Sequence, residues 1–432
     1  MSQRRRVAIT GLGLVTPVGN DVATTWAALL EGRNGVAPIT IFDASGFSTR
    51  IAAEVKDFSD AALATDRKLL KFANRSHRFA LGAAEQAMRD AGVAPTSANA
   101  ARWGCAVGTG MMGVAYEDLS AVQRHSAADG ELHADQLLND PTAADPIVFC
   151  RSQATAGLAL LTRRFGIQGY ATSVHTACAS GGQAIGTALK LIRRGSVDYA
   201  LAGGFDSMIS PVGLGGFCLL SAVSADNDTP QRASRPFDAT RNGFVLGEGA
   251  GFVVLEEWEA ARRRGARIYA ELAGDGNSLS SYRITDSPPD GDGPIQSMRA
   301  ALADADAAPD EVDYINAHGT STYMNDKSES AAIRKVFGDE TDAVAVSSTK
   351  SSMGHLIAAA GAVELVVCAL AIHHGELPIN ANLRERDPDC DLNLVVAPTK
   401  RRVRMTLSNS FGFGGSNSCV ALRHPDEVTG AG

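Results

Sequence analysis

The sequence predicts an α/β protein that contains two copies of one structural unit. Short apolar strands that run into glycines alternate along the chain with segments of helical period. Residues 7–13 and 269–276 are similar strand starts, and residues 178–186 and 353–361 are similar glycine-rich helix starts. The match is weak residue by residue, but the order of elements is the same, which indicates a duplication. Two such halves packed face to face would bring both helix N-termini together.

Length and composition fit a large globular enzyme. The chain has 432 residues, of which 45% are hydrophobic and 20% are charged, so it can bury two or three core units. Its 44 glycines indicate many tight turns and close approaches of the backbone. We place the boundary between the two units near residue 265. The halves are then 1–265, with a candidate nucleophile, and 266–432, with two candidate catalytic histidines.

Charge and cysteine content exclude several classes of function. The net charge of −8 argues against nucleic acid as the main partner. The seven cysteines are scattered, without a Cys-x-x-Cys or Cys/His cluster, which predicts a reduced, cytoplasmic protein without a metal site. The basic N-terminus, residues 1–6, lacks the apolar stretch of an export signal. The most apolar helix, residues 356–372, contains Glu364, so we interpret it as a core helix and expect no membrane partner.

The first elements follow from turn and capping signals. Residues 6–15 are predicted to form a strand, residues 16–20 a turn, and a helix is predicted to begin near Asp21. Further strands are predicted at 103–107, at 199–204, at the start of 252–265 before a basic helix, and at 267–272.

A glycine motif follows the strand at 103–107. Residues 108–113 satisfy Gly-x-Gly-x-x-Gly, but no acidic residue lies about twenty positions on in a βαβ context, so a dinucleotide site is not expected. Met111 and Met112 are instead expected to line an apolar pocket.

A basic cluster interrupts this acidic sequence between residues 67 and 78. We predict that it belongs to one helix continuing to Met88. A solvated helix face is one interpretation, and a docking site for an acidic partner is the other. Both remain open. The cluster consists of Arg67, Lys68, Lys71, Arg75 and Arg78.

Cys178 is the candidate nucleophile. Small and β-branched residues give way at Cys178 to a Ser-Gly-Gly turn, and a helical pattern follows through residue 192. A thiol at a helix start faces unpaired N–H groups and the positive end of the helix dipole, so its pKa should be depressed. Such a thiolate can accept an acyl group. The alternative is a small buried residue at a tight turn.

Three glycine-containing polar segments follow predicted strands, at residues 313–322, 346–355 and 408–417. His318 and His355 each lie beside a glycine in these loops, and His355 stands at a predicted helix start. One histidine after a strand is usually structural. Two in such surroundings favour a catalytic role.

Four motifs together resemble one family. Thr-Ala-Cys-Ala-Ser-Gly, Asn-Ala-His-Gly-Thr-Ser-Thr, Ser-Ser-Thr-Lys-Ser-Ser-Met-Gly-His and Asn-Ser-Phe-Gly-Phe-Gly-Gly-Ser-Asn occur in this order. They are similar to those of the elongating β-ketoacyl-acyl carrier protein synthases of type II, in the thiolase superfamily, and the resemblance covers essentially the whole chain. It implies a thiolase fold, with duplicated α/β halves in a five-layer αβαβα arrangement. It also implies a dimer and a decarboxylative Claisen condensation.

The resemblance also implies roles for individual residues. Cys178 matches the nucleophile that takes an acyl group from a phosphopantetheine thioester, and His318 and His355 match the pair that binds the malonyl thioester carbonyl. Lys350 matches the active-site lysine. Phe411 matches the residue whose N–H completes the oxyanion hole and whose ring gates the pocket.

Neutral imidazole N–H groups would stabilise the enolate formed when CO2 leaves, and a histidine at a helix start resists protonation. The substrates are expected on the phosphopantetheine of an acyl carrier protein, with no cofactor bound by the chain itself. Further expected contacts are Thr320, Thr322 and Thr285 for pantetheine, Glu364 as counter-ion of Lys350, and Arg235 with Arg67, Lys68 and Lys71 for the carrier protein.

Two departures bear on the pathway. Tyr323 and Met324 stand where the fatty-acid enzymes usually have proline and a small residue, whereas residues 234–250 resemble the ketosynthase subunits of type II polyketide systems. We therefore favour a polyketide role, with a housekeeping fatty-acid synthase as the alternative. A non-catalytic chain-length factor is disfavoured because that subunit generally lacks the cysteine. Whether the dimer partner is a second copy or a homologue remains open.

Overall fold

The computed structural model describes residues 4–63, 66–110, 115–128, 131–132 and 145–427. The first strand, β1 (Val7–Val15), is buried along its whole length, and α1 (Val22–Leu30) follows it. The Asp21 carboxylate caps this helix by accepting a hydrogen bond from the Thr24 backbone N–H, 2.8 Å away. The strand, the turn and the helix start predicted here are confirmed.

One ten-stranded mixed sheet organises the chain, in the order β12-β11-β15-β16-β10-β1-β9-β8-β4-β7. The two halves of the sheet have the same topology. From the central pair β1 and β10 outward, each half places its first strand in chain order innermost, followed by its fifth, fourth, second and third strands. The strand next to each central strand, β9 or β16, is antiparallel to both neighbours, and the outer strands are parallel. The duplication predicted from element order is therefore present in the sheet. The other nine strands of this sheet are β4 (Trp103–Thr109), β7 (Ala171–Val174), β8 (Tyr199–Ser207), β9 (Glu248–Glu257), β10 (Ala270–Leu279), β11 (Tyr314–Asn316), β12 (Ala345–Ser347), β15 (Met405–Phe411) and β16 (Ser416–Arg423).

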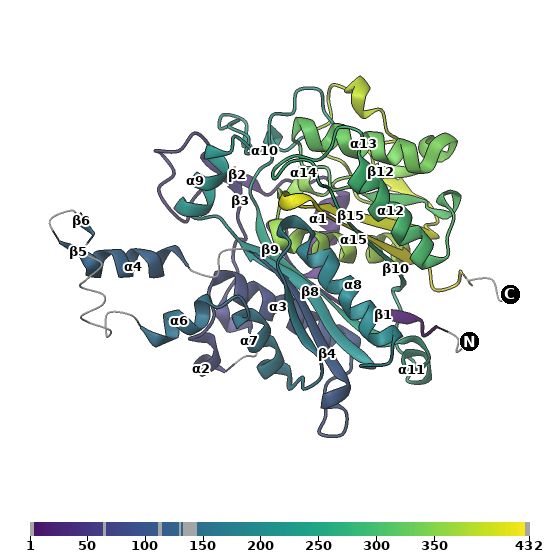
Figure 1. The fold of residues 1–432 in the computed structure, drawn as a ribbon, viewed down its shortest axis with the longest axis horizontal. Coiled ribbons are helices and arrows are strands. Elements are labelled where there is room, and N and C mark those ends of the chain that lie inside the picture. The colour runs from purple at the N-terminus through teal and green to yellow at the C-terminus, as the bar shows by residue number, and fades with distance from the viewer. Residues whose placement is uncertain (1–3, 64–65, 111–114, 129–130, 133–144, 428–432) are drawn as a thin grey trace.

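Helices cover both faces of each half and complete five layers (Figure 1). Helices α3 (Arg75–Ala91) and α7 (Ala156–Phe165) share a hydrophobic cluster with β1, β4, β8 and β9, four of the five strands of the first half. Helices α12 (Asp292–Ala305) and α13 (Tyr323–Phe337) do the same with the five strands of the second half. Between the halves, α8 (Ser180–Arg193) and α15 (Ala360–His374) pack against strands of both. The αβαβα thiolase-type arrangement is thus confirmed.

Shorter elements connect these layers. The helices are α2 (Arg67–Leu70), α4 (Tyr116–Ser126), α6 (Pro146–Ser152), α9 (Pro211–Leu219), α10 (Pro230–Ala233), α11 (Trp258–Arg263) and α14 (Lys350–Met353). The small strands are β2 (Val36–Pro38), β3 (Ile51–Ala53), β5 (Ala127–Ala128), β6 (Glu131–Leu132), β13 (Glu376–Leu377) and β14 (Thr399–Lys400).

The single helix predicted from the basic cluster to Met88 is wrong. The chain forms two helices there, because α2 ends at Leu70 and α3 starts only at Arg75. The Asn74 side chain caps α3 by accepting from the His77 N–H, while the His77 ring accepts from the Asn74 N–H. The capping asparagine marks this new start in the sequence.

The apolar helix of the C-terminal half, α15, is a core helix, as predicted. Residues 357–374 are long and apolar enough to cross a membrane, but 89% of this window is buried inside the protein. Glu364 is also buried there.

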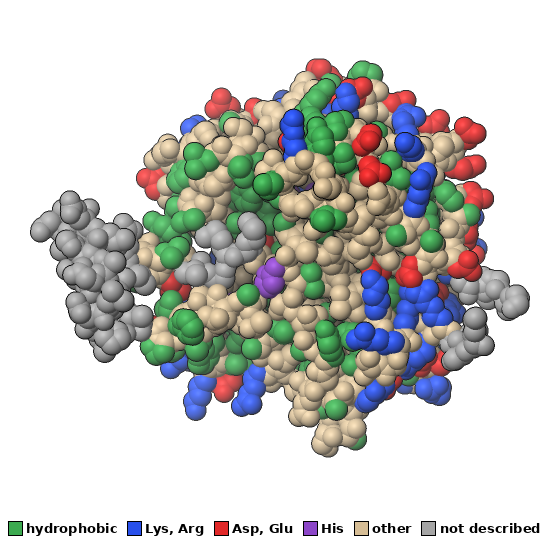
Figure 2. All heavy atoms as spheres, viewed as in Figure 1, with side chains coloured by type: hydrophobic (Ala, Val, Ile, Leu, Met, Phe, Trp, Pro, Cys, Tyr) green, Lys and Arg blue, Asp and Glu red, His purple; other side chains and the backbone are tan. Residues whose placement is uncertain are grey.

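Basic side chains gather at the lower right of the face in Figure 2, over the region where Figure 1 places α11 and the end of α8. Two basic residues of α8 form ion pairs, Lys190 with Asp275 at 2.5 Å and Arg193 with Asp304 at 2.7 Å. This pairing reduces the positive charge that the region presents to an anionic partner.

The two inner helices touch at their N-termini. A Cβ atom at Gly181 would lie 2.8 Å from the Ala362 nitrogen, and one at Gly361 would lie 2.9 Å from the Gly182 nitrogen. Each helix is entered through a 3₁₀ turn, Ala177–Ala179 or Ile357–Ala359. Counted from these 3₁₀ turns, Gly181 and Gly361 occupy equivalent positions in the two halves.

We expect Gly181→Ala to lower the free energy of unfolding by about 1–3 kcal/mol, because the added methyl group must displace the facing helix. Denaturant unfolding of the full chain measures this loss. Gly46→Ala is the matched control, since a Cβ there meets nothing within 4 Å. Equal stability of the two variants would contradict the proposed role of this close approach.

Candidate active site

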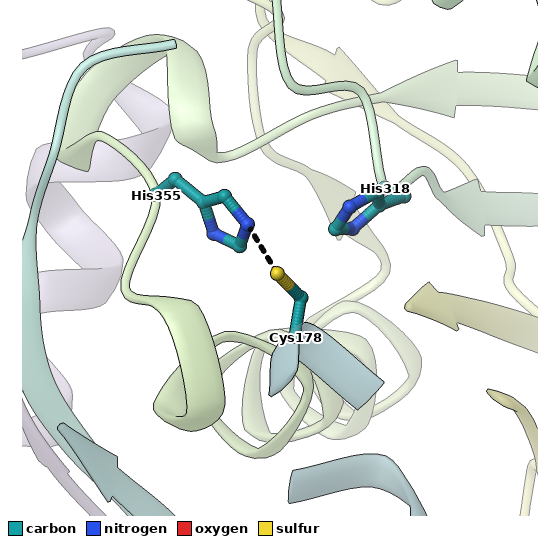
Figure 3. Close-up of side chains that lie close together, drawn as sticks. All are labelled: Cys178, His318 and His355. Atoms are coloured by element: carbon teal, nitrogen blue, oxygen red, sulfur yellow. Dashed lines mark hydrogen bonds between the residues drawn. The ribbon is translucent and has the colours of Figure 1, made fainter. Parts of the chain in front are cut away.

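Cys178 lies at the meeting point of the two halves. It occupies the 3₁₀ turn between β7 and α8, and its residue surface is 7% exposed. The His355 Nε2 atom lies 3.0 Å from the Cys178 Sγ atom (Figure 3). The first half thus supplies the thiol and the second half supplies the imidazole beside it.

The backbone fixes the tautomer of His355. Its Nδ1 atom accepts a hydrogen bond from the Ile357 N–H at 3.2 Å, so the ring proton resides on Nε2 and points toward the sulfur. The backbone N–H of His355 donates a hydrogen bond to the Val245 carbonyl, 2.7 Å away. Burial, together with repulsion from Lys350, lowers the pKa of His355 well below its ordinary value. The expected neutral ring is therefore present, with burial as the largest cause.

His318 stands on the other side of the thiol, in the loop after β11. Its ring centroid lies 5.3 Å from that of His355, at an interplanar angle of 81° (Figure 3). Burial is again the largest cause that lowers the pKa of His318, and the positive charges of Lys350 and of a protonated His355 add to it. Its Nδ1 atom has no hydrogen-bond partner among the described residues. Two neutral imidazoles thus face one thiol.

Glu329, which the sequence analysis missed, positions the His318 loop. This fully buried carboxylate on α13 accepts from the backbone N–H groups of His318 at 2.9 Å and Gly319 at 2.8 Å. Asn409 donates a third bond at 3.1 Å. Burial raises the pKa of Glu329 to about 7, against the lowering effect of these donors. No local sequence signal identifies Glu329, because a glutamate within a helix is usually solvated.

Lys350 and Glu364 form a buried ion pair beneath the site. The Nζ and Oε1 atoms are 2.5 Å apart, and the residues are each 1% exposed. Burial raises the pKa of Glu364 to about 7, and Lys350 opposes this rise. Glu364 is thus the counter-ion expected for a lysine near the core.

The depressed pKa expected for the Cys178 thiol is wrong. Burial raises this pKa to about 12, although Lys350 and the backbone N–H groups of Phe413 and Cys178 lower it. The helix start is present, but the thiol lies among apolar side chains such as Met208, Ile209 and Leu214, where an anion is poorly solvated. In the ligand-free protein the thiol is therefore protonated at neutral pH.

Phe413, and not Phe411, supplies the second backbone donor. The N–H groups that reach the Cys178 sulfur are those of Phe413 and of Cys178 itself. Phe411 is the last residue of β15, and its ring packs against that of His318 at 5.6 Å. The Phe413 ring faces Phe217 at 6.4 Å. The sequence assignment was therefore displaced by two residues within the glycine loop.

A cavity of about 360 Å³ leads to these groups, and its lining includes Cys178 and both histidines. The expected pantetheine residues Thr320, Thr322 and Thr285 also line it. The hydroxyl oxygens of Thr320 and Thr322 are 2.8 Å apart. Met111 and Met112, expected in the acyl pocket, lie outside the described residues.

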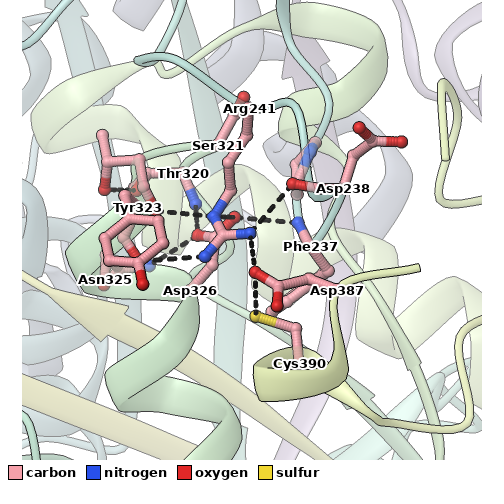
Figure 4. A network of polar contacts seen from close by, with 12 residues as sticks. Phe237, Asp238, Arg241, Thr320, Ser321, Tyr323, Asn325, Asp326, Asp387 and Cys390 are labelled. Atoms are coloured by element: carbon pink, nitrogen blue, oxygen red, sulfur yellow. Dashed lines mark hydrogen bonds and ion pairs between the residues drawn. The ribbon is translucent and has the colours of Figure 1, made fainter. Parts of the chain in front are cut away.

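A polar network behind the cavity wall holds the loop that carries Thr320 and Thr322 (Figure 4). The Arg241 side chain is fully buried; it donates to Asp387 at 2.6 Å and to the Thr322 carbonyl at 3.2 Å. Asp326 accepts from the Thr320 N–H at 2.9 Å. This network fixes the hydroxyls that face the cavity.

The predicted carrier-docking residues divide into two groups. Arg67, Lys68 and Lys71 on and beside α2 are exposed. Arg235 is different, because its side chain is only 12% exposed and donates to Asp226 at 2.6 Å and to the Thr240 carbonyl. These internal bonds occupy the guanidinium, so Arg235 is not a free surface cation, and its contact with a carrier protein stays a prediction.

Arg75 and Arg78 from the same basic cluster also bind within the protein. Arg75 donates to the buried carboxylate of Glu248 at 2.8 Å, and Arg78 pairs with Asp60.

The three central side chains could in principle ligate a metal ion. One ligand atom from each of Cys178, His318 and His355 lies within 4.8 Å of the others, and cysteine with histidine is a common zinc set. Metal-bound imidazoles normally donate their second N–H to an acceptor, whereas His355 Nδ1 accepts from Ile357. The charge of Lys350 acts on all three groups. The set is therefore better suited to stabilising an anion than to binding a cation.

Alkylation of Cys178 by iodoacetamide should accelerate about tenfold per pH unit from about pH 7 to 10, because the thiolate fraction rises tenfold per unit below the pKa. Intact-mass analysis follows the rate, with Cys178→Ala to subtract the other cysteines. A plateau below about pH 9 would instead support the low pKa that the sequence predicted.

Lys350→Ala should lower the free energy of unfolding by about 3–5 kcal/mol at neutral pH, because Glu364 is left buried without its partner. Part of the loss should return at about pH 6, where the carboxyl group, with its raised pKa, is protonated. The double variant Lys350→Met/Glu364→Leu should restore stability without restoring activity. Denaturant unfolding at both pH values measures these effects, and a stable single variant would contradict them.

Comparison with known proteins identifies two family models that match consecutive parts of the chain. A family model for the Beta-ketoacyl synthase N-terminal domain matches residues 4–261, and one for the Beta-ketoacyl synthase C-terminal domain matches residues 269–384. A 3-oxoacyl-[acyl-carrier-protein] synthase 2 of Coxiella burnetii is 43% identical over 422 residues, covering 97% of this chain and 99% of the relative. The tetracenomycin polyketide synthase ketoacyl synthase alpha subunit of Streptomyces glaucescens is 38% identical over 430 residues, covering 98% of each chain.

Solved structures agree with these sequence relatives. The ishigamide ketosynthase/chain length factor has a TM-score of 0.86 at 36% identity, covering 97% of this chain and 99% of that chain. The AntDE:AntF complex, a type II acyl-carrier protein with its ketosynthase, has a TM-score of 0.86 at 33% identity, covering 98% of this chain and 100% of that one. Together with the thiol and paired imidazoles, these matches show that the chain belongs to the β-ketoacyl synthase family and is a condensing enzyme, an acyltransferase.

Proposed function

We propose that the chain elongates an acyl group held on Cys178 by decarboxylative condensation with a malonyl group on an acyl carrier protein. The observation that carries this proposal is the pair of neutral imidazoles facing one buried thiol at the end of the cavity. A condensing enzyme needs a nucleophile that stores the acyl group and donors that stabilise an enolate beside it. The site combines both.

Acyl transfer comes first. The Cys178 sulfur attacks the thioester carbonyl, a new carbon–sulfur bond forms, and the bond to the pantetheine sulfur breaks. The proton of the thiol ends on the leaving pantetheine sulfur. Because Nε2 of His355 carries a proton, this ring stabilises the developing thiolate as a donor and does not act as its base.

Decarboxylation and carbon–carbon bond formation follow. The bond between the malonyl carboxylate and its C2 atom breaks, CO2 leaves, and the electron pair moves into an enolate whose oxygen accepts hydrogen bonds from His318 and His355. The C2 atom attacks the acyl carbonyl, and the N–H groups of Cys178 and Phe413 bind the resulting oxyanion. Collapse of this intermediate releases the Cys178 thiolate, which recovers a proton from water.

We favour the ketosynthase subunit of a type II polyketide system as the physiological role. The segment 234–250, Tyr323 and Met324 support this choice, as does the similarity to the ishigamide and AntDE ketosynthases. The second candidate is a fatty-acid β-ketoacyl synthase II, which the relative of Coxiella burnetii supports. The partner subunit is a homologous chain-length factor in the first role and a second copy of this chain in the other.

Intact-mass analysis after mixing with acyl- and malonyl-loaded carrier protein tests the reaction. Wild type should gain the acyl mass and release a product two carbons longer, whereas Cys178→Ala should do neither. Activity of the chain alone would support the fatty-acid role, and activity only with a homologous subunit would support the polyketide role. Absence of acylation at Cys178 in every combination would contradict the mechanism.

His318→Ala should separate the two chemical steps. We expect Cys178 to acquire the acyl group at a rate close to that of wild type, while release of CO2 falls about 100- to 1000-fold, because one donor to the enolate oxygen is lost. Mass analysis measures the first step and 14CO2 release from labelled malonyl carrier protein measures the second. Equal losses in both steps would contradict the division of roles.

The exposed basic residues of α2 are the proposed site for the acidic carrier protein. Lys68→Glu with Lys71→Glu should raise the KM for the carrier protein about tenfold, and added salt should reduce the difference from wild type. Arg262→Glu with Arg263→Glu on α11 is the control, since it makes the same change of charge at two other exposed basic residues. Equal KM values for both variants would contradict docking at α2.

A further inference from the structure

Tyr323 stands at the mouth of the cavity without a role in the mechanism above. It is the first residue of α13, it lines the cavity beside Thr322, and 53% of its surface is exposed. An exposed aromatic ring at the entrance of a catalytic cavity offers apolar contact area to whatever passes it.

The protein holds this ring in place before any ligand binds. The Arg241 guanidinium lies 5.0 Å from the ring centroid and donates to the Tyr323 carbonyl at 3.1 Å (Figure 4). Lys327, one turn along the helix, places its ammonium 5.8 Å from the same centroid. Because Arg241 is fully buried and paired with Asp387, the ring rests against a fixed cation. A ring fixed in this way loses little conformational freedom on binding.

The neighbouring groups indicate the chemistry of the ligand. Thr320 and Thr322 present two hydroxyls 2.8 Å apart, which suit amide groups. Ile284, which is 81% exposed, also lines the cavity and adds an apolar surface. A phosphopantetheine arm carries two amides and, nearer its phosphate, a carbon bearing two methyl groups. Its thiol end must reach Cys178, so its dimethyl segment lies toward the mouth.

We propose that Tyr323 binds the dimethyl segment of the pantetheine arm and thereby selects full-length pantetheine thioesters over thioesters of shorter thiols. This inference rests on the proposed function, because it presumes that acyl groups arrive on this arm. Tyr323 is a binding residue in this account. It does not take part in bond making or breaking.

Acylation of Cys178 by two small donors tests the inference. Acyl-pantetheine carries the dimethyl segment, whereas acyl-N-acetylcysteamine ends after the first amide and does not extend to the ring. Tyr323→Ala should raise the half-saturating concentration of acyl-pantetheine about tenfold, with its maximal rate unchanged. The same variant should change that of acyl-N-acetylcysteamine less than about twofold. Tyr323→Phe should behave as wild type with both donors, because the ring and not the hydroxyl makes the contact.

Tyr282→Ala is the matched control. Tyr282 is also exposed, at 46%, and has an arginine beside its ring, Arg283, at 5.3 Å. It is not among the described residues that line the cavity, so its loss should leave both donors unaffected.

The outcomes distinguish a failure of the role of Tyr323 from a failure of the proposed function. If wild type is acylated by both donors and Tyr323→Ala matches it, or loses affinity equally for both, the role of Tyr323 is overturned while the proposed function stands. If neither donor nor loaded carrier protein acylates wild type, the proposed function fails and this inference falls with it. A loss confined to acyl-pantetheine supports the inference.

Discussion

Contact between the N-termini of α8 and α15 is the constraint on which the rest of the structure depends. Each helix belongs to one half of the duplicated fold, and glycines at positions 181 and 361 let the two backbones approach within van der Waals distance. This approach places Cys178 of the first half 3.0 Å from His355 of the second. A side chain at either glycine would separate the nucleophile from its donor, so the catalytic distance follows from packing between two helices.

Burial dominates the electrostatics of the resulting site. It lowers the pKa values of both histidines and raises that of Cys178, so all three groups are neutral before substrate arrives. The charge of Lys350, which is paired with Glu364, acts on all three groups. Fixed N–H donors then act only on negative charge that develops during reaction, and in a buried site such donors are most effective.

Much of this arrangement was predictable from the sequence, because element order and short glycine-flanked motifs carry it. The duplication followed from the order of elements, and Cys178, His318 and His355 stood out in small polar loops. The pKa of Cys178 was not predictable, since the apolar side chains around it come from distant segments. Glu329 carries no local signal, because its partners are backbone N–H groups eleven and ten residues earlier.

Two other differences from the sequence-based expectations depend on how a loop folds. The backbone N–H group that acts on the Cys178 sulfur is that of Phe413. A glycine-rich loop allows either phenylalanine to present its N–H, so the choice depends on how the loop leaves β15. From the sequence alone, Arg235 is expected to be a free cation that can contact an acidic partner. In the fold, Asp226 and a carbonyl group of the same loop occupy its guanidinium.

The seam between β1 and β10 is short. Only Ala8 with Glu271 and Ile9 with Ala270 pair in register there, although the strands on either side continue for several residues. Two residue pairs join the central strands of the two halves, but so short a pairing only weakly resists rotation of one half relative to the other. The packing of α8 and α15 against each other and against strands of both halves therefore helps to hold the halves together. Catalytic distances in this enzyme consequently depend on core residues of those helices that never touch a substrate.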